Sequence, residues 1–161
     1  MSKAYSLAGI RLGWITGPDQ FAHDVTIHRD YNTISVGMVD DHLACIALEN
    51  AEAVLRRNRE LVRKNNATLN EWIGHQDALS WVRPKGGTIA LLEYSLPTPS
   101  RDLCVDLMAT PGVLLTPGSA LDAEGTLRIG YANNPTVLEA GLDRLADYLA
   151  NRLAATGTAP A

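Results

Sequence analysis

Apolar side chains recur at helical spacing through the stretch from Ser35 to Gly74, which contains no proline and almost no glycine. The members of this stripe are Val39, Leu43, Ile46, Ala47, Val54, Leu55, Leu61, Val62 and Leu69. The pattern predicts one long helix, or two helices separated by a single break. At 1.5 Å per residue, about 35 helical residues extend about 50 Å, which is longer than a compact small domain needs for itself. Such a helix is typical of a connection between two bodies.

The chain before this helix predicts one strand and one short helix. Residues 8–17 form an apolar run that is punctuated by glycines, which favours a strand at 9–16. Residues 19–29 have a mixed pattern that favours a helix ending near Tyr31. A strand buried on both faces needs neighbours for its main-chain groups, and the first 35 residues supply none. We therefore expect them to be one corner of a larger sheet.

The chain after the long helix predicts a small α+β layer. Strands are expected at 80–83, 88–94, 113–116 and 126–131, and helices at 102–109 and 136–153. Ser100 is expected to cap the first of these helices, and the tail from Ala154 to fray. The predicted organisation is 1–35 as the end of one domain, 36–65 as a connecting helix, 66–153 as a small domain and 154–161 as a tail.

Composition excludes several classes of protein. With 161 residues and 46% apolar content, the chain can bury the core of an ordinary domain. The formal charge of −4 is spread over both signs, so neither nucleic acid nor a membrane is expected as a partner. No stretch has the length of a bilayer span or the pattern of a signal peptide, which favours the cytoplasm. Cys45 and Cys104 lie in amphipathic patterns and are expected to be reduced core residues, and the four histidines show no metal-ligand spacing.

Candidate chemistry begins at Lys3, which is followed eight residues later by Arg11 between glycines. A lysine that forms an imine must be reachable and partly neutral, and a nearby guanidinium can grip a phosphate and lower the pKa of the amine. The ordinary alternatives are a solvated lysine and an arginine in a structural ion pair. On the residues alone, both interpretations stay open.

This stretch resembles the lysine attachment signature of class I and II aminotransferases, in which S-K is followed by five residues and then by G-x-R-x-G. The resemblance implies an α/β protein, the C-terminal portion of a fold-type-I enzyme that uses pyridoxal 5′-phosphate (PLP). It implies that Lys3 is the catalytic Schiff-base lysine and that Ser2 and Arg11 bind the cofactor. No metal site is implied.

A second family landmark lies near the C-terminus, at Pro117-Gly118-Ser119 and around Arg128. The resemblance implies that Arg128 clamps the α-carboxylate of an amino-acid substrate, because its planar fork matches a carboxylate. Tyr31 and Asn32 stand where the family reaches towards the partner subunit's active site and are candidate substrate contacts. Ordinary helix capping by Asn32 or Ser35 is the alternative. Pro84-Lys85-Gly86-Gly87 also resembles a family segment, with Thr88 in place of the common aromatic residue.

The expected function is that of a PLP-dependent aminotransferase, which exchanges amino groups between amino acids and 2-oxo acids and is a homodimer when complete. The family places its other cofactor contacts earlier in the chain than Lys3. We therefore expect a missing N-terminal domain and an isolated chain that is inactive. The alternatives are an oxidase, hydroxylase or cyclase of the same fold that acts on an arginine-like amino acid, and a non-catalytic small-domain fragment.

Overall fold

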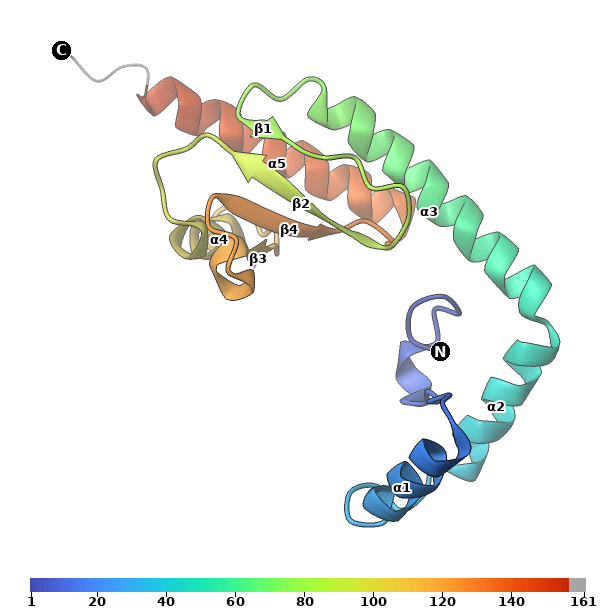
Figure 1. Ribbon diagram of the computed structural model, residues 1–161. Coiled ribbons are helices and arrows are strands. Elements are labelled where there is room, and N and C mark those ends of the chain that lie inside the picture. Colours follow the sequence, from blue (N-terminus) through green and yellow to red (C-terminus); the bar gives the residue numbers. More distant parts are fainter. Residues whose placement is uncertain (157–161) are drawn as a thin grey trace. The chain divides into compact units, whose positions relative to one another are not determined.

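The computed structural model describes residues 1–156, which divide into two compact units (Figure 1). One unit comprises Met1–Glu60 and the other begins at Leu61. The boundary falls inside the helix α3 (Ala51–Ile73), so one helix contributes residues to both units. The limits of 35 and 65 that the sequence suggested for the domains stay predictions.

The first unit contains helices and irregular chain. Its elements are the 3-10 helix η1 (Ala8–Ile10), α1 (Asp19–Arg29), α2 (Met38–Glu49) and the beginning of α3. The helix predicted at 19–29 is confirmed by α1. The strand predicted at 9–16 is wrong, because η1 occupies its beginning and the chain is irregular from Arg11 to Pro18. The described residues of this unit include no strand with which the apolar run could pair. Trp14 and Ile15 are accordingly 56% and 68% exposed.

A single break divides the long helical stretch at Asn50, between α2 and α3. The main-chain N–H and the Nδ2 atom of Asn50 both donate to the carbonyl O of Ile46, at 3.1 Å and 2.8 Å. These bonds close α2 at its C-terminal end. Of the two possibilities that the pattern left open, two helices with one break is therefore confirmed.

The second unit is built on a four-stranded antiparallel sheet with the order β1-β2-β4-β3. Its strands are β1 (Leu79–Ser80), β2 (Ile89–Tyr94), β3 (Thr116–Pro117) and β4 (Thr126–Gly130). Its helices are α4 (Ser100–Ala109), the 3-10 helix η2 (Gly118–Leu121) and α5 (Pro135–Thr156), together with the end of α3. The predicted α+β layer is thus present, and its last helix runs past Leu153; residues 157–161 of the predicted tail lie outside the described residues.

Only one face of this sheet is covered. Alternate residues of the central strands, Ala90 and Leu92 on β2 and Leu127 and Ile129 on β4, are buried. They join one apolar cluster with side chains from three helices, among them Leu69, Ile73, Leu103, Leu107, Leu138, Leu142, Leu145 and Leu149. Residues with the opposite parity, such as Leu91 and Arg128, lie on the open face.

Two predicted strands are shorter than expected. The strand at 80–83 ends at Ser80, and Arg83 instead donates its Nε–H to Oδ1 of Asn66 on α3, at 2.8 Å. The strand at 113–116 is paired only at Thr116 and Pro117. The main-chain N–H of Val113 donates to the carbonyl O of Leu107 near the end of α4, 2.9 Å away, so this N–H is not available to β4.

The cysteine prediction is half correct. Cys104 is buried on α4, and burial raises the pKa of its thiol. Cys45 is exposed on α2, because the buried side of that helix is formed by its neighbours Ala44 and Ala47. Cys45 is therefore not a core residue of the described chain.

Candidate functional site

The segment around Lys3 is a series of turns held by a helix. Lys3 is exposed, and its carbonyl O accepts a hydrogen bond from the N–H of Ser6 at 3.1 Å. The next carbonyl O, that of Ala4, accepts from Nδ2 of Asn58 on α3 at 2.7 Å. Asn58 is 8% exposed, so this bond is sheltered from water. The lysine side chain is reachable while the backbone beside it is fixed.

Arg11 lies directly after η1 in the left-handed region, with φ of 49°. Its main-chain N–H and its Nη1 atom both donate to the carbonyl O of Ala8, at 3.4 Å and 2.9 Å. The Nη1 bond occupies one corner of an exposed guanidinium and leaves the rest of the fork available to an anion. Ser2, Lys3 and Arg11 thus belong to one unit. The amine can condense with an aldehyde, and the hydroxyl and the guanidinium can donate hydrogen bonds to a phosphate.

Tyr31 and Asn32 lie in the turn after α1. Tyr31 is 89% exposed, and the main-chain N–H of Asn32 donates to the carbonyl O of Arg29 at 2.9 Å. The capping alternative for Asn32 and Ser35 is wrong, because Gly37 is the N-cap residue of α2 and no side chain caps it. Both candidate substrate contacts therefore remain exposed side chains in the described structure.

Arg128 lies in the middle of β4 on the open face of the sheet. Its neighbours across the sheet are Leu91 on β2 and Thr116 on β3. Within residues 1–156, no carboxylate forms an ion pair or hydrogen bond with its guanidinium. An arginine in a strand is ordinarily paired with a nearby acid, and the described residues of this unit give that role no support. The fork is available to a carboxylate from outside the chain.

The loop before β4 is fastened by Glu124. Its carboxylate accepts hydrogen bonds from the main-chain N–H of Ser100 at 2.6 Å, from the hydroxyl of Ser100 at 2.9 Å and from the hydroxyl of Tyr94 at 3.3 Å. These bonds, with the Ser100 N–H foremost, lower the pKa of Glu124. The pKa of Tyr94 is raised by burial and then by this carboxylate. The prediction that Ser100 caps α4 is wrong, because Pro99 is the N-cap residue and the Ser100 hydroxyl is bonded to Glu124.

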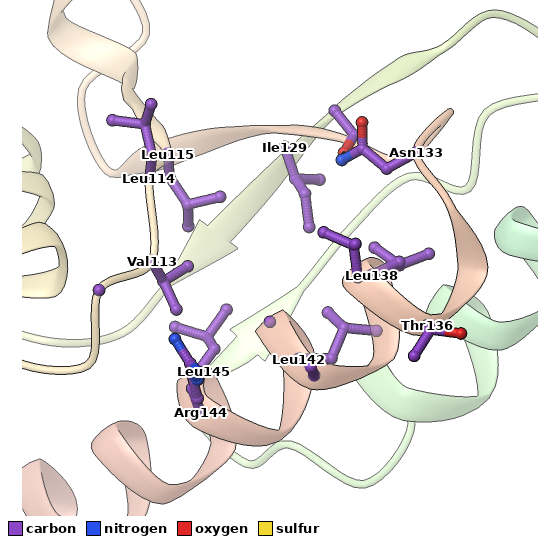
Figure 2. A pocket seen from close by; sticks show the side chains of 15 residues that line it. Val113, Leu114, Leu115, Ile129, Asn133, Thr136, Leu138, Leu142, Arg144 and Leu145 are labelled. Carbon is purple, nitrogen blue, oxygen red and sulfur yellow. The ribbon is translucent and has the colours of Figure 1, made fainter.

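A groove of about 480 Å³ lies beside β4, between residues 112–115 and α5 (Figure 2). Its walls are mostly aliphatic, with Leu115, Ile129 and Leu138 among them. Asn133, Thr136 and Arg144 add the polar groups. The groove lies where β3 would continue along β4 if the pairing extended beyond Thr116.

Two residues that hold this region together, Glu124 and Asn65, were not predicted from the sequence. Asn65 is 1% exposed and donates its Nδ2 to the carbonyl O atoms of Tyr131 and Asn133. A signal for Asn65 was present, because it falls on the apolar stripe that runs through Val62 and Leu69. Glu124 carried no local signal, since its partners lie 24 and 30 residues away along the chain.

The described part of the chain contains no candidate metal cluster and no candidate membrane-spanning helix. In residues 1–156, no group of three or more His, Cys, Asp or Glu side chains could hold a metal ion. None of the helices in that same range combines the length and the apolar character that a membrane crossing requires.

Comparison with known proteins identifies the family. The pattern of "Aminotransferase class I and II" matches residues 1–149, which is nearly the whole chain. The chain belongs to the class I and II aminotransferases. This match includes the segment of Lys3 and the strand of Arg128, and it confirms the resemblance that both motifs carried.

Three relatives illustrate the range of the family. Capreomycidine synthase of Streptomyces vinaceus is 32% identical over 150 residues, which are 92% of this chain and 39% of that protein. A PLP-dependent aminotransferase of Streptococcus suis has a solved structure with a TM-score of 0.91 at 34% identity, covering 94% of this chain and 40% of that one. The PLP-dependent cyclase OrfR gives a TM-score of 0.87 at 28% identity and covers 94% and 42%. The predicted fold class is confirmed, and the chain spans about two fifths of the length of its relatives.

Proposed function

We propose that this chain supplies the cofactor lysine and the substrate carboxylate clamp of a PLP-dependent aminotransferase, and that a further segment supplies the rest of the site. The observation that carries the proposal is that the Arg128 guanidinium has no acid partner in residues 1–156 of a chain of this family. An arginine on an open sheet face, with no acid partner in residues 1–156, suits an amino acid's α-carboxylate. The share of about 39% that the chain covers in its relatives supports the need for a further segment.

The residues of this chain have distinct proposed roles. PLP, when bound, supplies an aldehyde that condenses with amines and a ring that withdraws electrons from the α-carbon of the substrate. Arg11 binds the phosphate with the N–H groups that it does not use on Ala8, and Ser2 adds a hydroxyl. Arg128 binds the α-carboxylate and thereby orients the α-carbon. Lys3, when its amine is neutral, accepts a proton from that carbon and returns it to the product.

The resemblance of the motifs supports a homodimeric complete enzyme that acts on an amino acid and a 2-oxo acid, and we propose that this enzyme acts in the cytoplasm. Tyr31 and Asn32 are proposed substrate contacts in that assembly. Their exposure on one unit leaves them available to a neighbouring subunit.

A second candidate function is a cyclisation or a related reaction on the same fold, on an arginine-like amino acid. The names of two relatives, a capreomycidine synthase and a PLP-dependent cyclase, favour it as an alternative. Lys3, Arg11 and Arg128 would have the same roles in both reactions, so the geometry of these residues does not separate the two.

Product analysis tests the proposed function. The complete protein is incubated with PLP and single amino acids, with and without a 2-oxo acid, and the products are identified by mass spectrometry. An aminotransferase forms a new amino acid from the 2-oxo acid, and its steady turnover stops when the 2-oxo acid is omitted. Turnover of one amino acid to a cyclised or oxidised product, independent of any 2-oxo acid, would instead support the second candidate.

A further inference from the structure

Helix α3 carries the three asparagines that are buried in residues 1–156. Asn58, Asn65 and Asn66 are 8%, 1% and 9% exposed. Each of them donates its side-chain amide to a main-chain carbonyl of another segment. Asparagine is a poor residue for a helix interior and is costly to bury. These positions therefore serve the segments that they bind rather than the helix itself.

Asn65 uses both protons of its amide at the end of the strand that carries Arg128. Its Nδ2 atom lies 2.7 Å from the carbonyl O of Tyr131 and 2.8 Å from that of Asn133. Its Oδ1 atom has no hydrogen-bond partner among the described residues, although it is buried. A leucine here would continue the apolar stripe without that cost. Leucine could not donate the two hydrogen bonds that Asn65 makes to the carbonyls of Tyr131 and Asn133.

Strand β4 needs such an anchor because its second half is paired on one side only. Ile129 and Gly130 pair with β2, but β3 reaches only as far as Arg128. Beyond that point the side of β4 away from β2 borders the groove, whose lining includes Ile129 and Asn133 (Figure 2). Arg128 thus stands at the last position where β4 has strands on both sides.

Tyr131 continues the anchor to β2. It is fully buried, and its main-chain N–H donates to the carbonyl O of Thr88 at 3.0 Å. Its hydroxyl donates to the carbonyl O of Gly87 at 2.9 Å. Asn65 therefore binds the carbonyl of a residue that is itself tied to the beginning of β2, the strand opposite Arg128.

We propose that Asn65 is a positioning residue for Arg128, because it fixes the backbone at the end of β4, a strand whose second half has a pairing strand on one side only. The proposal rests on the proposed role of Arg128 as a carboxylate clamp. Asn65 acts through the backbone of residues 131–133 and does not touch the substrate. Removing its amide is expected to loosen the end of β4 and to weaken the binding of a carboxylate by Arg128, while the helix itself remains formed.

The test uses the full 161-residue chain and acetate as the probe. The Nε resonance of Arg128 is followed by ¹⁵N NMR during a titration with sodium acetate at constant ionic strength. The variant Asn65→Leu removes the amide at nearly constant volume. The matched control Asn66→Leu removes a buried amide one residue away, whose partners are Arg83 and Pro84 rather than β4. Urea unfolding and the spectra of Leu127 and Ile129 report whether each variant is folded.

Acetate is expected to shift the Arg128 resonance in the parent, with a dissociation constant that rises about threefold to tenfold in Asn65→Leu and stays within about twofold in Asn66→Leu. If Asn65→Leu does not fold, Tyr131→Phe removes only the hydroxyl bond to Gly87 and is expected to change binding in the same direction by a smaller factor. Equal affinities in the parent, in Tyr131→Phe and in any folded Asn65→Leu would overturn the positioning role. No response of Arg128 in the parent would overturn the carboxylate clamp, and the positioning role with it.

Discussion

Gly118 is the position where the smallest change should cost the most. It begins η2 in the loop between β3 and β4, and it is buried. A Cβ atom at this position would lie 2.6 Å from the carbonyl O of Thr126. It would lie even closer to the carbonyl O of Ala123 and to Oγ1 of Thr126. Two of these three atoms are main-chain oxygens, which cannot rotate away.

The expected cost of Gly118→Ala follows from these contacts. Overpacking a tight position costs about 1–3 kcal/mol. Moving the oxygens apart also breaks two hydrogen bonds, from the N–H of Ala123 to Gly118 at 2.9 Å and from the hydroxyl of Thr126 to Ala123 at 2.6 Å. At about 1 kcal/mol each, they bring the loss to about 3–5 kcal/mol. That is a large part of the stability of an ordinary domain, which is about 5–15 kcal/mol.

Urea unfolding measures this loss. Trp72 and Trp81 pack against the core of the second unit, so their fluorescence reports its unfolding. The same substitution at Gly141 on α5 is the control, because a Cβ there meets no atom within 4 Å. Alanine in a helix interior is expected to stabilise by about 0.5–1 kcal/mol relative to glycine. A Gly118→Ala variant whose free energy of unfolding lies within about 0.5 kcal/mol of the parent would show that the loop accommodates a Cβ atom at this position.

Two further substitutions test the carboxylate of Glu124 and the guanidinium of Arg128. Glu124→Gln is expected to lower the free energy of unfolding at neutral pH, relative to the control Glu139→Gln. Because the pKa of Glu124 is lowered in the fold, the stabilisation by its carboxylate is present above the unfolded pKa of 4.5 and is lost as the pH falls through the folded pKa. The free energies of unfolding of the parent and the variant should therefore converge in acid. A difference between them that is constant with pH would contradict this. Arg128→Lys in the complete enzyme is expected to lower kcat/KM at least tenfold, about 1.5–3 kcal/mol, with the absorbance of the cofactor nearly unchanged, because an ammonium lacks the planar fork. Unaltered kinetics across several amino acids, as expected for Arg144→Lys, would return Arg128 to a structural role.

Helices were the elements that the sequence predicted best, because a helix that buries one side reveals that side by local periodicity. The helical stretch between Ser35 and Gly74 followed from this spacing, and its break at Asn50 was one of the two possibilities that the pattern left open. The helix at 19–29 was predicted from a mixed pattern. The central strands β2 and β4 also followed, since their buried residues alternate. Periodicity is a property of neighbouring residues, so it needs no knowledge of the rest of the fold.

Predictions failed where the outcome depended on a distant partner. The run at 9–16 has the composition of a buried strand, yet a strand forms only beside another strand, and none is present in the described residues. Ser100 has the residue type of an N-cap, yet the carboxylate of Glu124, 24 residues later, takes its hydroxyl. The strand at 113–116 is short because the end of α4 binds the N–H of Val113.

The candidate site divides in the same way. Lys3, Arg11 and Arg128 were predicted because their motifs are continuous in the sequence and resemble those of a family. The residues that bind the main chain near them belong to no motif: Asn58 binds the carbonyl of Ala4, and Asn65 binds that of Tyr131. They were visible only as polar positions on the buried side of a helix, and their partners lie 54 and 66 residues away.

Peptide mapping of the lysines determines whether Lys3 carries the cofactor. The isolated chain and the complete protein are each treated with PLP, reduced with borohydride and digested, and the labelled peptides are identified by mass spectrometry. Lys64 and Lys85, the other lysines of the chain, are internal controls for surface labelling. We expect one cofactor per chain on Lys3 in the complete protein, and no preference for Lys3 and no transamination in the isolated chain. Labelling of the complete protein that does not favour Lys3, or specific labelling of Lys3 with steady turnover in the isolated chain, would contradict this expectation.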